Sequence, residues 1–212
     1  GAPLGSPSRS VELASLKKLC AARPELKIVS YELKAPAGRI DGARKEIAET
    51  CDKLAPLGIR LFIEPEAPSE TMAAETTMLL GELDAADMTH PRRVGLKLRG
   101  SGPTAVDKAA LAVLLEDIVM RSLPFKATAG LHHPLVETQR YDNALGFMGL
   151  VTALRLTQVL GAEEFDAQAR LACLSELQPE AFEFDGGAAW RQFRADLPEL
   201  EEAMAALPFT IG

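Results

Sequence analysis

The sequence predicts a parallel α/β fold of the TIM-barrel type. The two observations behind this prediction are the alternation of strand-like and helical segments and the length of the chain. Short β-rich runs alternate with amphipathic helical stretches along most of the 212 residues. Strands that are joined by single helices pair in parallel, because a tight turn cannot connect parallel neighbours. A typical barrel takes ~250 residues, so we expect one α/β domain over 1–212 that forms a compact or incomplete barrel. An open doubly wound sheet is the alternative.

Three helices and two strands are expected in the first half of the chain. The helices show apolar residues at steps of three and four, with a capping Ser or a terminating Pro or Gly. The strands are short β-rich runs between them. In chain order these elements are a helix from Ser10 to just before Pro24, a strand over 27–33, a helix over 39–55 that ends at Gly58, a strand over 59–64 and a helix that Ser69 caps.

The second half continues the alternation and ends in strand-like residues. Thr104 and Asp107 form a variant capping box that starts one helix, and Tyr141-Asp142-Asn143 is interpreted as the N-cap of a later one. In chain order the elements are a strand over 93–99, the helix from Thr104, a strand over 124–129, helices near 142–160 and 163–177, a short strand over 181–184, a helical stretch and the start of a strand over 207–212.

Composition and charge argue against several classes of protein. The net charge of -7 disfavours nucleic acid or an anionic membrane as the main partner. No apolar run reaches the ~18 residues that a membrane span needs, and no signal peptide opens the chain. Cys20, Cys51 and Cys173 are expected to be reduced, mostly buried thiols of a cytoplasmic protein. The chain starts without Met, as a tag remnant, a processed end or a cut within a longer chain would leave it.

Charged residues interrupt one face of four successive predicted strands. Side chains alternate across a strand, and the other face of each of these strands is apolar. A strand buried on both faces would carry Val, Ile or Leu throughout. The charged residues near the carboxyl ends are Glu32, Glu64, Lys97, Arg99 and Lys126. Because α/β proteins build their active sites at this edge, the charges predict a site for a small anionic metabolite.

A structural ion-pair network is the alternative explanation of these charges. Glu64 would then neutralise Lys97, and Glu32 would pair with Arg60. Buried ion pairs rarely improve on hydrophobic packing, so a row of them favours a functional site.

The histidines add a candidate proton carrier. His132 and His133 follow the fourth strand in a loop between Gly130 and Pro134. Imidazole titrates near neutral pH, so we expect one of the two to enter the pocket and the other to anchor the loop. A metal site would need one of them together with a strand-end carboxylate, but no known ligand spacing is present, and we expect no metal and no cofactor. His90, at the opposite edge, is expected to be structural.

A glycine-containing loop could contribute to anion binding. The backbone N–H groups of Gly100-Ser101-Gly102 lie ahead of a predicted helix N-terminus, which favours negative charge; a plain turn is the alternative. Arg99, and Thr128 on the strand face of Lys126, complete the expected ligand-binding set. The expected partner is a small anionic metabolite, and a homo-oligomer stays open.

Several of these residues resemble the C-terminal half of the class I aldolases of the deoxyribose-phosphate type. The resemblance rests on Ile63-Glu64, Gly95-Leu96-Lys97 and the run 124–130. It implies that Lys97 matches the Schiff-base lysine, that Lys126 matches a second cation and that Gly130 falls in the phosphate-binding loop. The run Lys126-Ala127-Thr128-Ala129-Gly130-Leu131-His132-His133-Pro134, KATAGLHHP in one-letter code, also resembles a group of uncharacterised bacterial proteins.

The leading hypothesis is a lyase of the aldolase type that acts on a small anionic carbonyl or sugar-phosphate compound. Lys97 or Lys126 would be the nucleophile or electrophile, Glu64 or Glu32 the acid or base, and His132 or His133 a proton shuttle. The first alternative is a phosphate-binding isomerase or transferase that uses the lysines as clamps. The second is a metabolite-binding barrel without catalysis.

Overall fold

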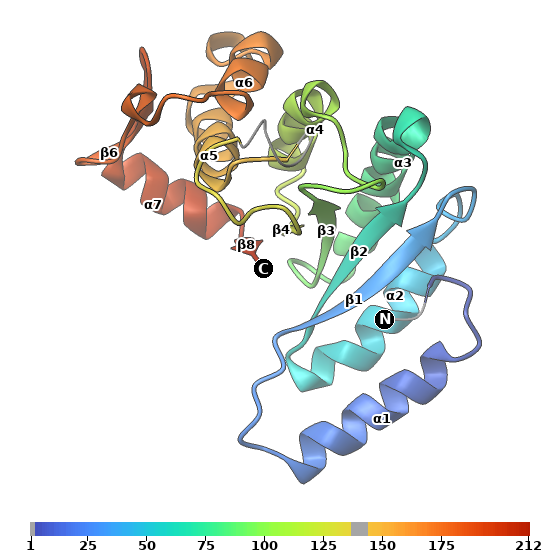
Figure 1. Ribbon diagram of the computed structural model, residues 1–212. Helices are drawn as coiled ribbons and strands as arrows, with labels where there is room; N and C mark the ends of the chain where they lie inside the picture. The colour runs from blue at the N-terminus through green and yellow to red at the C-terminus, as the bar shows by residue number, and fades with distance from the viewer. Residues whose placement is uncertain (1–2, 137–143) are drawn as a thin grey trace. The chain divides into compact units, whose positions relative to one another are not determined.

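The computed structural model describes residues 3–136 and 144–212, and the chain divides into two compact units, Gly1–Lys97 and Leu98–Gly212 (Figure 1). The expectation of one domain stays a prediction. None of the helices in the described part of the chain has the length and apolar character that crossing a membrane requires.

The main sheet has five parallel strands, hydrogen-bonded in the order β1-β2-β3-β4-β8, and helices flank it. This confirms the predicted α/β class with a parallel sheet. The described strands do not close into a barrel.

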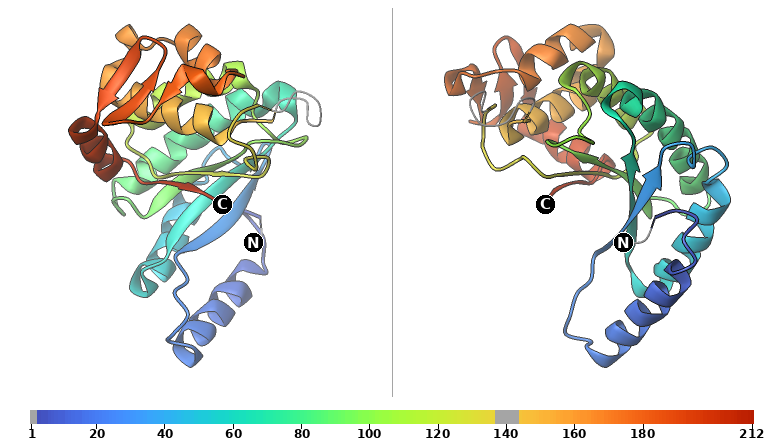
Figure 2. Two further views of the ribbon diagram at one scale, coloured as in Figure 1. Left: turned by 60° about the vertical axis from the view of Figure 1, so that its left-hand side comes forward. Right: turned by 45° about the vertical axis from the view of Figure 1, so that its right-hand side comes forward.

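In the first unit, α2 and α3 pack against β2 and lie on one side of the strands (Figure 2). Leu33, Leu61 and Ile63 are buried in the unit's core. Gly58 ends the segment after α2 with φ of 70°, which is the role predicted for it. The elements are α1 (Arg9–Ala22), β1 (Ser30–Pro36), α2 (Arg44–Leu54), the 3-10 helix η1 (Ala55–Leu57), β2 (Arg60–Glu66), α3 (Ser69–Asp87) and β3 (Val94–Arg99), whose last two residues belong to the second unit.

In the second unit, α4, α5 and α6 pack together. β8 pairs in parallel with β4, with Phe209 opposite Phe125, which confirms the strand predicted near the end of the chain. The elements are α4 (Lys108–Met120), β4 (Phe125–Thr128), α5 (Phe147–Glu164), α6 (Ala167–Leu174), the 3-10 helix η2 (Pro179–Ala181), β5 (Phe182–Glu183), β6 (Gly187–Trp190), β7 (Phe193–Asp196), α7 (Leu197–Ala206) and β8 (Phe209–Ile211).

A buried arginine joins the helices of the second unit. Arg170 is only 1% exposed. Its guanidinium donates hydrogen bonds to the carbonyl oxygens of Ala112, at 2.6 Å, and Phe165, at 2.9 Å. It also forms an ion pair with Glu116 at 2.8 Å. Arg170 therefore supplies donors to backbone oxygens inside the packed helices.

The predicted helix starts need correction. α1 begins at Arg9 with Ser8 as its N-cap, so Ser10 lies inside the helix. Ser69 is the first residue of α3 rather than its cap. Each start is one or two residues from the prediction, as is common because helix ends are weakly defined.

α4 begins at Lys108 rather than near Thr104, because the Asp107 carboxylate accepts a hydrogen bond from the N–H of Ala110 and caps the helix. The predicted cap at Tyr141-Asp142-Asn143 lies outside the described residues. α5 begins after Gly146.

β5 falls within the strand predicted over 181–184, but the three-stranded antiparallel sheet β5-β6-β7 that it joins was not expected from the sequence. Its strands have two to four residues each, too few to show a period of two. Trp190 and Phe193 stack in this sheet with ring centroids 5.9 Å apart, and Phe193 meets Phe165 edge to face at 4.9 Å. These ring contacts link the small sheet to the end of α5.

Candidate functional site

A buried lysine between two glutamates is the centre of the candidate site. Lys97 Nζ lies 2.7 Å from Oε2 of Glu32 and 2.7 Å from Oε2 of Glu64. The side chains of Lys97 and Glu64 are 11% and 7% exposed, whereas that of Glu32 is 32% exposed. All three residues belong to the first unit. We call this group the lysine triad.

Strand register brings the lysine triad together. Glu32 on β1 is opposite Phe62 on β2, which in turn is opposite Gly95 on β3. Glu64 comes two residues after Phe62, and Lys97 comes two residues after Gly95. Because side chains alternate along a strand, Glu64 and Lys97 lie on the same face of the sheet as Glu32. Lys97 therefore reaches Glu64 on the neighbouring strand and also spans β2 to reach Glu32.

The two carboxylates determine the charge state of Lys97. Burial alone lowers the pKa of Lys97, but the hydrogen bonds and charges of Glu32 and Glu64 outweigh it and raise the pKa above its ordinary 10.5. The side chain is thus a protonated donor at neutral pH. With both carboxylates ionised, the lysine triad carries a net charge of about -1, from one ammonium and two carboxylates.

The alternative ion-pair network is present in part. The expected pair of Glu64 with Lys97 is formed. The prediction that Glu32 pairs with Arg60 is wrong. Glu32 pairs with Lys97 instead, and Arg60 donates its Nε–H to the carbonyl oxygen of Arg92 at 3.0 Å.

In the second unit, the predicted anion loop packs tightly against the loop after β4. The N–H of Gly100 donates to the carbonyl oxygens of Thr128, at 2.8 Å, and Ala129, at 3.0 Å. A Cβ at Gly100 would lie 2.7 Å from the Ala129 oxygen, and one at Gly130, where φ is 76°, would clash with Ser101. Gly100 and Gly130 therefore allow two backbone segments to approach closely. The Gly100 N–H is already used by the fold.

The N-terminus of α4 is also occupied. Asp107 places its carboxylate there as the helix cap, so an acidic side chain already meets the positive end of the helix dipole. Roles in anion binding for Ser101, Gly102 and Arg99 stay predictions.

The polar face of β4 lies where alternation predicted it. Lys126 and Thr128 are half-buried, while Phe125 and Ala127, which alternate with them along the strand, are buried. The hydroxyl of Thr128 is buried without a hydrogen-bond partner among the described residues. A Cβ at Gly212 would lie 3.3 Å from Cε of Lys126, so a side chain at the last residue would meet this lysine.

The two loop histidines differ in their surroundings. His132 is exposed and His133 half-buried. The carbonyl oxygen of His133 accepts a hydrogen bond from the N–H of Phe147 at the start of α5. This is a backbone contact, so the roles expected of the two imidazoles stay predictions. His90 lies 3.4 Å from an Asp52 carboxylate oxygen in the turn before β3, in agreement with a structural role.

The lysine triad lies in the first unit, whereas Arg99, Lys126 and both loop histidines lie in the second. That all of these residues share one pocket therefore stays a prediction. Over residues 3–136 and 144–212, no three His, Cys, Asp or Glu side chains come together in a group that could hold a metal ion.

Comparison with known proteins adds no assignment: no protein-family model, curated protein sequence or solved structure matches this chain.

Proposed function

We propose that this protein is an enzyme that removes a proton next to the carbonyl group of a small substrate, with the lysine triad as its catalytic centre. The observation that carries the proposal is a buried ammonium held by two carboxylates. Lys97 and Glu64 lie in the carboxyl halves of β3 and β2, toward the end at which α/β enzymes place their active sites, while Glu32 lies in the amino half of β1.

Lys97 would act as the electrophile. An ammonium has three N–H donors, and Glu32 and Glu64 accept two of them. In this proposal the third donates to the substrate carbonyl oxygen. It stabilises the negative charge that develops there when the neighbouring carbon loses its proton.

The two glutamates would have different roles, because they differ in exposure. Glu32, 32% exposed, is the base that a substrate can reach. The C–H bond breaks, the proton passes to a Glu32 oxygen, and the electron pair forms an enolate held by Lys97. Glu64, 7% exposed, is a positioning residue that fixes the ammonium. Return of the proton to a different carbon makes the enzyme an isomerase.

In the aldolase-type alternative, Lys97 or Lys126 is the nucleophile, and the lysine triad bears on Lys97. Its amine must first lose a proton, and the raised pKa of Lys97 opposes that step. The net negative charge of the lysine triad also gives no attraction to an anionic group. The proposal therefore specifies a carbonyl compound and leaves an anion-binding role for Arg99 and Lys126 as a separate hypothesis.

The winding of the sheet supports assignment to the barrel class. β1, β2, β3 and β4 are neighbours in chain order, as in TIM barrels, whereas a doubly wound sheet reverses its order partway. An incomplete barrel is thus the fold that we propose.

Deuterium exchange tests the function. The full chain is incubated in D₂O with a panel of small aldehydes, ketones and ketose phosphates, and loss of the proton next to the carbonyl is followed by NMR. We expect exchange with at least one compound, and a loss of about 100-fold or more in Glu32→Gln. Glu66→Gln is the matched control, because the Glu66 side chain at the end of β2 is 40% exposed and pairs with Lys34.

Each other outcome has a defined meaning. Compounds that bind without any exchange would indicate the non-catalytic alternative and overturn the proposal. A borohydride-trapped adduct on Lys97, found by mass spectrometry, would replace the ammonium mechanism with the aldolase type. Retention of partial activity in Lys97→Arg supports the ammonium role, since arginine keeps the charge but cannot form an imine.

A further inference from the structure

The last strand of the main sheet has an open edge. β8 is hydrogen-bonded to β4 on one side, and in the described part of the chain no other strand pairs with it. Thr210 is exposed, and Ile211 is 41% exposed. We call the side of Phe209–Ile211 that faces away from β4 the β8 edge.

The backbone groups of the β8 edge belong to Phe209 and Ile211. The carbonyl oxygen of Pro208 accepts a hydrogen bond from the N–H of Phe125 at 3.0 Å, and Gly212 donates its N–H to β4 at 3.1 Å. Alternate residues of a strand direct their backbone groups to the same side. The N–H and C=O groups of Phe209 and Ile211 therefore point to the β8 edge.

The strand that presents this edge is held in place by the rest of the second unit. The Phe209 ring stacks on the Phe125 ring with centroids 5.3 Å apart, and the Arg155 guanidinium lies 6.0 Å from the centroid of the Phe209 ring. Arg155 also donates a hydrogen bond at 3.2 Å to the carbonyl oxygen of Leu207, just before β8. The β8 edge is therefore already in strand conformation, and pairing with it costs little ordering entropy.

The β8 edge lacks the charges that keep edge strands apart. Natural sheets protect such edges with charged residues, prolines or bulges, because an open edge can pair with another chain. β7, an edge strand of the small sheet, carries Arg194 and Asp196, and the N–H of Asp196 already donates to the Glu199 carboxylate at 2.8 Å. β8 has no charged side chain, so nothing on the strand itself repels a partner strand.

The β8 edge is complementary to itself. A two-fold axis at Thr210 places Phe209 of one copy opposite Ile211 of the other in an antiparallel pair. Each of these two pairs can exchange two hydrogen bonds, so every N–H of the β8 edge meets a C=O of the second copy. The exposed Ile211 then packs beside Phe209 of the second copy, since opposite side chains share a face. A second copy of the chain therefore fits this edge without any further partner, and two-fold dimers are the commonest homo-oligomers.

We propose that two copies of this chain form a dimer by antiparallel pairing of their β8 strands. The main sheets of the two copies then become one continuous sheet. Because β8 has three residues, the shared edge is short, and we expect a monomer–dimer equilibrium rather than a permanent dimer. Association stops at the dimer, because a two-fold pair uses the whole β8 edge of each copy.

Sedimentation of the full chain tests the proposal. The average mass is measured up to about 1 mM protein, and it should rise with concentration toward that of a dimer. Ile211→Pro removes an N–H from the β8 edge, where proline is compatible with a strand. We expect it to weaken dimerisation about tenfold or more, since two of the four shared hydrogen bonds are lost. Ile211→Val is the matched control, because it keeps the N–H, and it should change the affinity by no more than about twofold.

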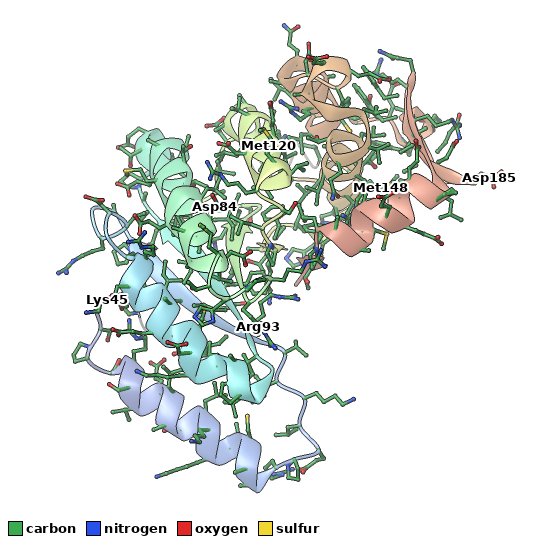
Figure 3. All side chains as sticks on the ribbon, turned by 180° about the vertical axis from the view of Figure 1, so that it is seen from behind. Lys45, Asp84, Arg93, Met120, Met148 and Asp185 are labelled. Carbon is green, nitrogen blue, oxygen red and sulfur yellow. The ribbon has the colours of Figure 1, made fainter. Side chains whose placement is uncertain are left out.

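A cross-link tests the position of the two-fold axis. The pairing puts Thr210 of the two copies at a non-hydrogen-bonded position, where opposite Cα atoms are about 4.5 Å apart and a disulfide can form. Thr210→Cys, in a Cys20→Ser background that leaves only buried thiols elsewhere, should give a disulfide-linked dimer in oxidised glutathione. Asp185→Cys in the same background is the control, because Asp185 is exposed between β5 and β6 and lies at the outer end of the small sheet in Figure 3.

Four results would overturn the proposal. The first is a wild type that stays monomeric over the whole concentration range. The second is a mass that rises beyond that of a dimer, since this needs a contact at another surface. The third is dimerisation of Ile211→Pro as tight as that of Ile211→Val. The fourth is cross-linking of Thr210→Cys no faster than that of Asp185→Cys. If Ile211→Pro lowers the melting temperature strongly, the cross-linking comparison decides.

Discussion

Glu32 and Lys97 are hydrogen-bonded at 2.7 Å although they are 65 residues apart and lie on β1 and β3, which β2 separates. The contact requires the Lys97 side chain to extend over the middle strand, where its Nζ also lies 2.7 Å from Glu64. Two carboxylates on different strands thus share one ammonium, and the lysine triad crosslinks three strands of the first unit.

Removal of the ammonium should destabilise the protein strongly. Lys97→Met leaves the buried Glu64 carboxylate without its cation, and breaking a buried ion pair in this way costs about 3–5 kcal/mol. Urea unfolding followed by circular dichroism measures the loss. Lys45→Met, on an exposed helix position, is the control and should change the free energy of unfolding by no more than about 0.5 kcal/mol. A small loss in Lys97→Met would show that water reaches the triad freely.

The contribution of the lysine triad should depend on alkaline pH. The pKa of Lys97 is raised in the folded state, so protonated Lys97 stabilises the fold fully below the unfolded pKa of about 10.4. The stabilisation is lost as pH rises through the higher folded value. The difference in unfolding free energy between wild type and Lys97→Met should be constant from pH 7 to about 10 and shrink above that. A difference that shrinks below pH 9 would contradict the raised pKa.

Two glycines should respond to alanine in opposite directions. Gly130→Ala puts a methyl group against Ser101 at a φ of 76°, and strain with overpacking should cost about 1–3 kcal/mol. Gly81→Ala is the paired substitution, because Gly81 lies inside α3 with open space around it. It should stabilise by about 0.5–1 kcal/mol. Thermal unfolding of both variants compares the two effects, and equal shifts would show that the loop contact is not rigid.

The buried arginine of the second unit should matter more than an exposed one. Arg170→Met removes the donors to the Ala112 and Phe165 carbonyl oxygens, and each unsatisfied buried acceptor costs about 1–3 kcal/mol. Arg194→Met breaks an exposed pair with Glu183 and should cost about 1 kcal/mol at most. Chemical denaturation of both variants measures the contrast. Similar losses would mean that water replaces the guanidinium.

The three thiols should differ in their rates of alkylation. Burial raises the pKa of the Cys51 thiol to about 12, and burial also raises that of Cys173. Cys20 is half-buried on α1. Iodoacetamide at pH 8 should therefore modify Cys20 first, because the thiolate is the reactive form, and should modify the other two only after unfolding. Peptide mass spectrometry follows the order, and rapid modification of Cys51 in the folded protein would contradict it.

The lysine triad shows what sequence reasoning can and cannot predict. Period-two alternation places Glu64 and Lys97 on one strand face, and parallel pairing makes them neighbours. The partner of Glu32 could not be predicted, because Lys97 reaches across a strand and side-chain reach is not visible in a strand pattern.

Pairing of β4 with β8 has a consequence for the order of folding. The sequence separation between paired residues is larger for β4 and β8, where Phe125 pairs with Phe209, than for β1 and β2 in the first unit, where Ser30 pairs with Arg60. Closing a longer loop costs more entropy, and contacts between distant residues slow folding. The first unit can therefore form its strand pairs early, while one edge of β4 stays unpaired until β8 docks on it. During that interval the unpaired edge can accept a strand from another chain, which makes aggregation the main competitor of correct folding in the second unit.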